Sequence, residues 1–348
     1  MNTATFPAAL AAPAQLPLRS RTAYGFATLG TGSFLVVPQL FLLFFMTDHL
    51  GIAAVWASFT LLLPKLWEFL TDPYIGLRSD RAHTRWGRRH PFMLAGAVLL
   101  SLGIALVFNV PGLETPQARW LYVTLMFVLA TTGYALFSVP YTALLGEMTA
   151  DPHERTRLVA LRMGFLGISL LIAAVGWPEV LKALGATTRA YGVVGWGVGA
   201  LCLAAMLVTV LGTRRMPLLQ GESDEMPLAA QLRVVLGAEP PKTGPQPRRR
   251  CFILGSAIGV AGYLVSAAGL DAPLWVLVAG AVLAGIGFSA GQVFGFSLLP
   301  DVIDLHRRGS GASRNGAFTG VWVGWEKIGL ALGATLAGLV LGWCGFVA

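Results

Sequence analysis

Residues 91–110 read PFMLAGAVLLSLGIALVFNV, twenty residues without a single charged side chain. The hydrocarbon core of a bilayer is about 30 Å thick, and a helix needs about 20 apolar residues to cross it. The rest of the chain has the same character, since 55% of its 348 residues are hydrophobic, 12% are charged and the mean hydropathy is +0.68. A soluble domain carries about 25% charged residues. The composition therefore predicts a membrane protein rather than a soluble one.

Eight further apolar runs flank this one, so that nine transmembrane helices are predicted. The nine runs cover residues 22–47, 52–76, 91–110, 119–146, 160–182, 190–213, 251–269, 273–299 and 316–344. In lipid, unpaired backbone groups are too costly for any structure other than helices or closed barrels. Because the runs are too long and continuous for barrel strands, the predicted fold class is an all-α polytopic helical bundle.

The basic residues are distributed unevenly among the loops. If the N-terminus is cytoplasmic, 20 of the 25 lysines and arginines fall in cytoplasmic segments, three fall in external segments and two lie within the spans. Cytoplasmic loops of membrane proteins carry such an excess of positive charge. The distribution predicts a cytoplasmic N-terminus and, with nine spans, an external C-terminus. It also accounts for the net charge of +8 without a nucleic-acid partner.

One long loop, rich in proline and charge, divides the chain. Residues 1–21 are a predicted cytoplasmic tail, 22–213 a six-helix bundle, 214–250 a cytoplasmic linker and 251–348 an incomplete bundle of three helices. The three cysteines are odd in number and unclustered, which argues against a disulfide framework or a zinc site. No cofactor is expected.

The second predicted span carries three charged residues, Lys65, Glu68 and Asp72. Their three- and four-residue spacings place them on one helical face, and charged side chains inside a span point to function. Two neighbouring carboxylates favour a cation between them, so the pattern predicts a site for Na⁺, Li⁺ or a proton. The alternative is a structural pair of Lys65 and Glu68, with Asp72 near the membrane interface.

The last predicted span carries Glu326 and Lys327. A lysine at this depth needs an opposite charge, which the face formed by Glu68 and Asp72 can supply. The alternative pairs Lys327 with its neighbour Glu326, although adjacent residues point about 100° apart on a helix.

The loop between the second and third spans, residues 76–91, reads GLRSDRAHTRWGRRHP. Its charged residues can form a cytoplasmic gate with acids at the end of a neighbouring helix. The gate residues expected in the loop are Asp80, Arg81, Arg88 and Arg89. The acids available to them are Asp301 and Asp304 after the eighth span, or Glu147, Asp151 and Glu154 after the fourth. The alternative is a basic loop that serves only to orient the protein in the membrane.

Seven segments carry a resemblance to a known family. They are Tyr24-Gly25-Phe26, residues 65–73 (KLWEFLTDP), residues 86–91 (WGRRHP), residues 138–141 (SVPY), the arginines at 155, 157 and 162, residues 299–304 (LPDVID) and residues 316–327 (GAFTGVWVGWEK). In order and spacing they resemble the major facilitator superfamily. More narrowly, they are similar to the glycoside–pentoside–hexuronide:cation symporters, the family of the melibiose carrier.

The resemblance implies roles for particular residues. In that family two acids of the second helix form a cation site with a lysine close by, and these correspond here to Glu68, Asp72 and Lys327. The substrate site it implies contains Ser138, Tyr141, Thr142 and Arg162. Where the melibiose carrier has acids that hold galactosides, this chain has Gly32 and Ser138, so melibiose is not the expected substrate.

The family has twelve helices, and matching the motifs leaves the seventh, eighth and twelfth without a counterpart here. The leading hypothesis is a bacterial inner-membrane symporter that couples Na⁺ or H⁺ to a sugar or glycoside by alternating access. A membrane-inserted remnant that transports nothing, or a chain completed by partner chains, are alternatives that the missing helices raise. A third hypothesis is a lysolipid transporter, because the pocket lacks acids. An enzyme is not expected, since all five histidines lie at loops or span ends.

Overall fold

The computed structural model describes residues 16–82, 84–149, 151–216, 246–268, 273–310 and 318–326. Within these residues the chain is helical and contains no strand. The first half holds α1 (Leu18–Phe44), α2 (Ala54–Arg81), α3 (His90–Val107), α4 (Pro116–Met148), α5 (Pro152–Leu171), α6 (Trp177–Ala183) and α7 (Thr188–Thr213). The second half holds α9 (Gln246–Ala268), α10 (Leu274–Ser310) and a helical segment at 318–326.

Each predicted span has a helical counterpart among the described residues. A π-helical turn at Phe45–His49 extends α1. A second π-helical turn, at Ile172–Gly176, joins α5 to α6, so that α5 and α6 together correspond to one predicted span. The ninth span is described only over 318–326. The prediction ended α2 and α10 too early because it followed apolar residues, whereas both helices continue into charged sequence as far as Arg81 and Ser310.

Six of the described helical runs are long and apolar enough to cross a bilayer. They are Leu18–His49, His90–Val107, Pro116–Met148, Pro152–Ala183, Thr188–Thr213 and Trp275–Phe296. The helix α2 is not among them, and it is the helix that contains Lys65, Glu68 and Asp72. Large apolar side chains cover the outside of the molecule, as at Leu171, which is 67% exposed. Such a surface suits contact with lipid tails rather than water.

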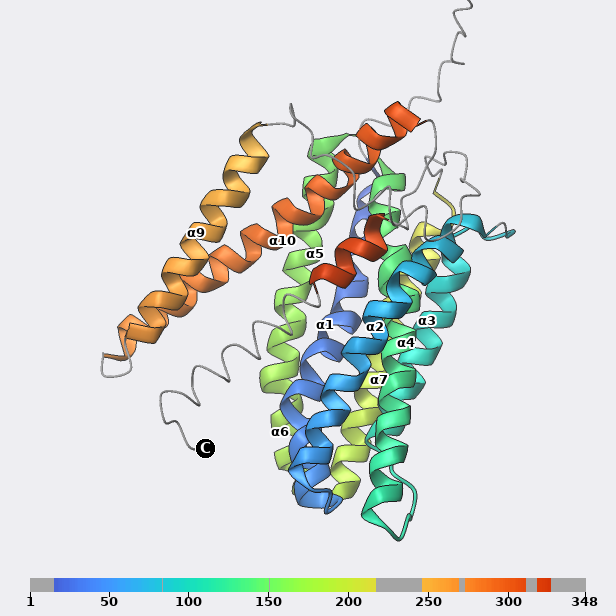
Figure 1. Ribbon diagram of the computed structural model, residues 1–348, viewed down its shortest axis with the longest axis vertical. Helices are drawn as coiled ribbons and strands as arrows, with labels where there is room; N and C mark the ends of the chain where they lie inside the picture. Colours follow the sequence, from blue (N-terminus) through green and yellow to red (C-terminus); the bar gives the residue numbers. More distant parts are fainter. Residues whose placement is uncertain are drawn as a thin grey trace, which may run out of the picture.

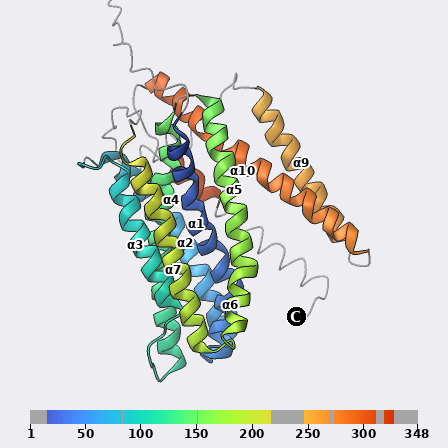
Figure 2. The ribbon, with the colours of Figure 1, turned by 180° about the vertical axis from the view of Figure 1, so that it is seen from behind.

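The helices α1–α7 stand roughly parallel in one bundle, and α9 and α10 pack against each other and lean away from it (Figures 1 and 2). Within the bundle, α3 packs on α4 and α7, and α1 packs on α5 and α7. Gly133 allows the close crossing of α3 and α4, since a Cβ there would collide with the backbone of Leu100. Small residues permit such approach between membrane helices. In the second half, it is α10 that packs on the bundle, mainly at α5.

Candidate functional site

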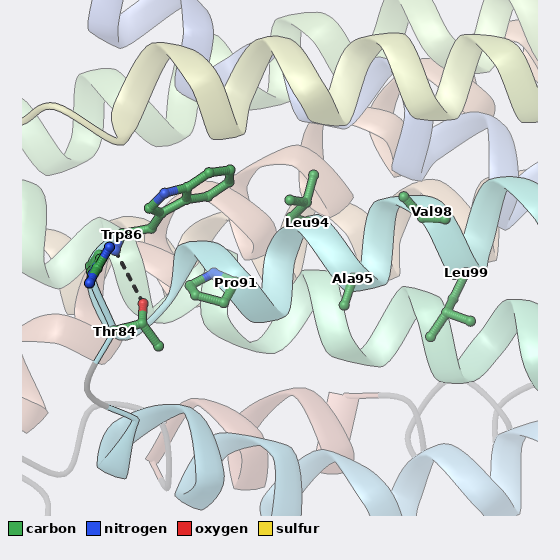
Figure 3. A pocket seen from close by; sticks show the side chains of 8 residues that line it. Thr84, Trp86, Pro91, Leu94, Ala95, Val98 and Leu99 are labelled. Carbon is green, nitrogen blue, oxygen red and sulfur yellow. Dashed lines mark hydrogen bonds between the residues drawn. The ribbon is translucent and has the colours of Figure 1, made fainter.

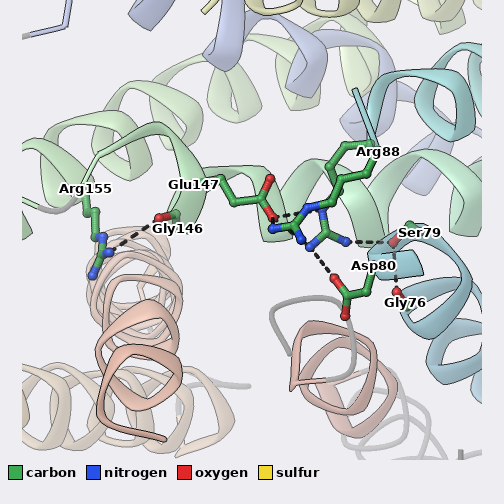
Figure 4. Close-up of polar contacts among 8 residues, drawn as sticks. Gly76, Ser79, Asp80, Arg88, Gly146, Glu147 and Arg155 are labelled. Atoms are coloured by element: carbon green, nitrogen blue, oxygen red, sulfur yellow. Dashed lines mark hydrogen bonds and ion pairs between the residues drawn. The ribbon is translucent and has the colours of Figure 1, made fainter. Parts of the chain in front are cut away.

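A buried network of charges joins the ends of α2 and α4 to the start of α3 (Figure 4). The Arg89 side chain is fully buried and donates from Nη2 to Asp80 Oδ1 at 2.5 Å and to Glu147 Oε1 at 2.8 Å. Its Nη1 donates to Ser79 Oγ at 2.7 Å, and Arg88 Nη2 donates to the same Glu147 oxygen at 2.7 Å. Burial lowers the pKa of Arg89, but the charges of Asp80 and Glu147 outweigh this and raise the pKa above its ordinary value.

The local sequence explains how two arginines reach this network. Gly87 has a φ of +84°, a conformation that glycine adopts without strain. Pro91 lies in the first turn of α3, where its missing N–H costs nothing. The turn at Gly87 and the helix start at His90 together direct the side chains of Arg88 and Arg89 inward.

The acids that the sequence predicted as possible gate partners differ in the contacts they make in the structure. Glu147 is the acid that Arg88 and Arg89 contact. Glu154 instead pairs with Arg21 and Arg157, each at 3.0 Å. Asp151 Oδ1 accepts from the backbone N–H of His153 at the start of α5. Arg81 is exposed at the end of α2. The side chains of Asp301 and Asp304, on α10, lie outside the described residues. The sequence did not pair Asp80 with Arg89; in the structure Asp80 lies in the last turn of α2 and Arg89 directly before α3.

The charged face of α2 forms as the spacing predicted. Glu68 is 1% exposed and Asp72 is 0% exposed, while Lys65 is only half-buried. Lys65 Nζ lies 3.6 Å from Glu68 Oε2. The pair proposed in the structural alternative is therefore present, but Asp72 is fully buried.

The segment 318–326 packs directly on this part of α2. A Cβ at Gly320 would lie 2.7 Å from the carbonyl oxygen of Asp72, and one at Gly324 would contact the Phe69 ring at 3.6 Å. Glu326 Oε1 accepts from Gln292 Nε2 of α10 at 2.8 Å, a contact that the sequence did not predict. Lys327, the expected partner of the α2 acids, lies outside the described residues.

A second cluster lies between α4, α5 and α10. The Arg162 guanidinium sits between two rings, 5.1 Å from the centre of Tyr141 and 4.7 Å from that of Phe296. Tyr141 stacks on Tyr24 at 4.5 Å, and its hydroxyl donates to the Tyr24 carbonyl oxygen at 2.8 Å. Among the described residues, Arg162 Nε and Nη1 have no hydrogen-bond partner, and these two atoms are buried.

The other expected substrate residues lie on the same helix as Tyr141. Ser138 precedes it by one turn of α4 and has a buried hydroxyl without a hydrogen-bond partner in the described part of the chain. Thr142 is 4% exposed on the same helix. There is no open space beside Gly32, because a Cβ added there would lie 2.8 Å from both Leu166 Cδ1 and Ser169 Oγ. Gly32 therefore does not line this cluster. The sequence selected Arg162 and Tyr141 as candidates but not Phe296, whose contact with Arg162 joins the two halves of the chain.

Comparison with known proteins relates this arrangement to transporters. The family model described as MFS/sugar transport protein matches residues 23–241 and 242–348. An uncharacterized symporter of Synechocystis, sll1374, is 24% identical over 487 aligned positions that cover 96% of this chain and 87% of the relative. The isoprimeverose transporter of Lactiplantibacillus pentosus is 29% identical over 210 residues, 60% of this chain and 43% of that protein. The putative glycoside/cation symporter YagG of Escherichia coli is 33% identical over 168 residues, 48% of this chain and 36% of that protein.

A solved structure supports the fold. The chain resembles a bacterial homologue of the iron transporter ferroportin in its outward-facing state, with a TM-score of 0.58 and 15% identity over 94% of this chain and 92% of that one. At this identity the likeness concerns the fold alone. The family match covers most of the sequence, and the expectation that the chain is not an enzyme agrees with it. The chain is an integral membrane protein that belongs to the sugar-transport family of the major facilitator superfamily, as its resemblance to the glycoside–pentoside–hexuronide:cation symporters predicted.

Proposed function

We propose that the chain is a secondary active transporter that carries a sugar or glycoside together with Na⁺ or H⁺. The observation that carries this proposal is the pair of buried carboxylates, Glu68 and Asp72, on successive turns of α2. They are separated by about 6 Å along the helix axis, and the segment 318–326 of the second half packs on the same part of α2, at the Asp72 backbone and the Phe69 ring. The interface between the halves is where transporters of this architecture bind their substrates and coupling ions.

The chemistry of this pair suits a coupling ion. Burial disfavours the ionised form of a carboxylate, and a second carboxylate nearby disfavours it further. A sodium ion or a proton removes part of this cost when it binds. Lys65 contributes one positive charge at 3.6 Å from Glu68, against the two negative charges that Glu68 and Asp72 carry when both are ionised. Occupancy of the site therefore changes the charge at the contact between the halves.

The substrate is proposed to bind at Arg162 and Ser138. Ligand sites combine mostly apolar walls with a few polar groups that fix orientation, and here the walls are the rings of Tyr141 and Phe296. Buried donors without partners are costly, and the hydroxyl groups of a sugar would accept from Arg162 and exchange a hydrogen bond with Ser138. Thr142 completes this face of α4. Because Arg162 belongs to α5 and Phe296 to α10, a bound sugar would contact both halves.

The test compares the wild type with Asp72→Asn in mild detergent and in proteoliposomes. We expect Na⁺ or acid pH to stabilise the wild type against heat, because a ligand of the folded state stabilises it by RT ln(1 + [L]/Kd), about 2.7 kcal/mol at a hundredfold excess over Kd. Asp72→Asn should lose this response and the ion-driven uptake of sugar. Glu114→Gln, which also removes one negative charge but at an exposed position, is the matched control. Identical ion responses in the wild type and in Asp72→Asn would contradict the proposal.

A non-transporting membrane protein remains the second candidate, and one observation favours it. The alignment with the Synechocystis symporter runs over 487 positions, whereas this chain has 348 residues, so the relative contains segments without a counterpart here. A folded, monodisperse protein that shows neither ion-dependent stabilisation nor uptake would support this candidate. Competition of uptake by lysolipid rather than by sugars would instead support an amphiphile transporter with the same cation site.

A further inference from the structure

An open apolar groove runs along the outer side of α3 from its N-terminal end (Figure 3). It encloses about 650 Å³, and its walls are Trp86, Pro91, Leu94, Ala95, Val98 and Leu99, with Thr84 and Arg85 at its end. Ala95 and Val98 are exposed, so the groove opens on the surface of the molecule. It lies away from the clusters at Asp72 and Arg162, which involve α2, α4, α5 and α10.

Positive charge gathers at one end of this groove only. Arg85 lines it, and the Arg214 guanidinium lies 5.9 Å from the centre of the Trp86 ring. Arg215 follows Arg214, and all three arginines are exposed. Unlike Arg88 and Arg89, none of the three forms an ion pair with another described residue. The groove is therefore apolar along its length and carries positive charge at its end.

The structure holds this end in a fixed shape. His90 Nε2 and Thr213 Oγ1, both buried, lie 3.1 Å apart and join the start of α3 to the end of α7. Thr84 Oγ1 accepts from the Trp86 backbone N–H at 3.2 Å and donates to the Gly87 carbonyl oxygen at 2.6 Å. These contacts place the indole of Trp86 and the arginine after Thr213 side by side before any ligand binds.

We propose that this groove binds an anionic glycerophospholipid, with one acyl chain along α3 and its phosphate between Arg85 and Arg214. Tryptophan lies by preference at the level of lipid headgroups, and basic residues next to a transmembrane helix attract anionic lipids. A soluble anion would contact the arginines but not the apolar wall from Pro91 to Leu99. A zwitterionic lipid would contact this wall but would gain little binding energy from the arginines. An anionic lipid matches both parts of the groove.

The test measures lipid retention by native mass spectrometry and thermal stability in detergent, with phosphatidylglycerol, phosphatidylcholine or inorganic phosphate added. The wild type should retain phosphatidylglycerol in preference to phosphatidylcholine and should be stabilised by it. The double variant Arg85→Gln/Arg214→Gln should bind phosphatidylglycerol about thirtyfold more weakly, at the usual contribution of an arginine near an anionic headgroup. The matched control is Lys182→Gln/Arg189→Gln, which removes two exposed positive charges at the end of α6 and the start of α7 and should bind like the wild type.

A second variant keeps the proposal testable if the arginine variant does not fold. Ala95→Phe fills the groove, leaves both arginines in place and should reduce the retention of phosphatidylglycerol. Equal retention of the two lipids by the wild type would overturn the proposal. So would an equal loss of binding in the two double variants, or stabilisation by inorganic phosphate as large as that by phosphatidylglycerol.

Discussion

Replacing Arg89 by lysine is the sharpest test of the buried charge network that joins α2, α3 and α4. The guanidinium reaches three acceptors on two helices from its two terminal nitrogen atoms: Ser79 and Asp80 on α2, and Glu147 on α4. A lysine keeps the charge but has a single ammonium group that cannot reproduce this fork. At least one buried acceptor then loses a charge-assisted hydrogen bond, each of which contributes about 1.5–3 kcal/mol. We expect Arg89→Lys to lower the free energy of unfolding by about 2–4 kcal/mol.

The assay is equilibrium unfolding in mixed detergent micelles, with Arg85→Lys as the control. Arg85 lies in the same loop but is exposed, and none of the described residues pairs with it. Its substitution should change the free energy by less than about 0.5 kcal/mol. If Arg89→Lys is as stable as Arg85→Lys, the network does not hold α2, α3 and α4 together and the reasoning is refuted. If Arg89→Lys is stable but transports abnormally, the network acts as a gate rather than as a structural clamp.

Two further predictions concern the α1–α5 crossing and the substrate cluster. Gly32→Ala should destabilise the fold by about 1–3 kcal/mol, because the added Cβ would overlap Leu166 and Ser169. The control is Gly164→Ala, where the added Cβ meets no atom within 4 Å, and it should not destabilise the fold in the same unfolding assay. Arg162→Lys keeps the positive charge but loses the planar guanidinium that lies between the rings of Tyr141 and Phe296. The KM for sugar uptake should therefore rise about tenfold. An unchanged KM would contradict the proposal that Arg162 binds the substrate.

The sequence predicted those features that depend on spacing within one helix. Lys65, Glu68 and Asp72 share a face because three- and four-residue steps bring side chains to the same side of any α-helix. The burial of Glu68 and Asp72 follows from the cost of a carboxylate in lipid, which forces such residues toward the protein interior. The assignment of the helices succeeded for the same reason, since length and hydropathy determine which segments can span a bilayer.

Contacts between distant helices could not be predicted in this way. The sequence made five acids available to Arg88 and Arg89. The packing of α3 on α4 brings Glu147 to them, whereas Asp151 and Glu154 contact other groups. The hydrogen bond between Gln292 and Glu326 depends on how α10 approaches the segment 318–326. The contact of Phe296 with Arg162 was not predicted, because a phenylalanine in an apolar span carries no signal that distinguishes a contact with a buried arginine from a contact with lipid.

The helix α2 connects the two charged regions of the molecule. Asp72 and Asp80 lie eight residues apart on it, about 12 Å along the axis. Between them stands Pro73, which cannot donate a hydrogen bond to the preceding turn and so weakens the helix at the point where Gly320 packs on it. At its C-terminal end Asp80 and Ser79 are hydrogen-bonded to Arg89, whereas the backbone at Asp72 packs on Gly320 of the second half of the chain. A change in charge at Asp72 therefore acts on the part of α2 that touches the second half, while the network around Arg89 anchors the other end to the first half.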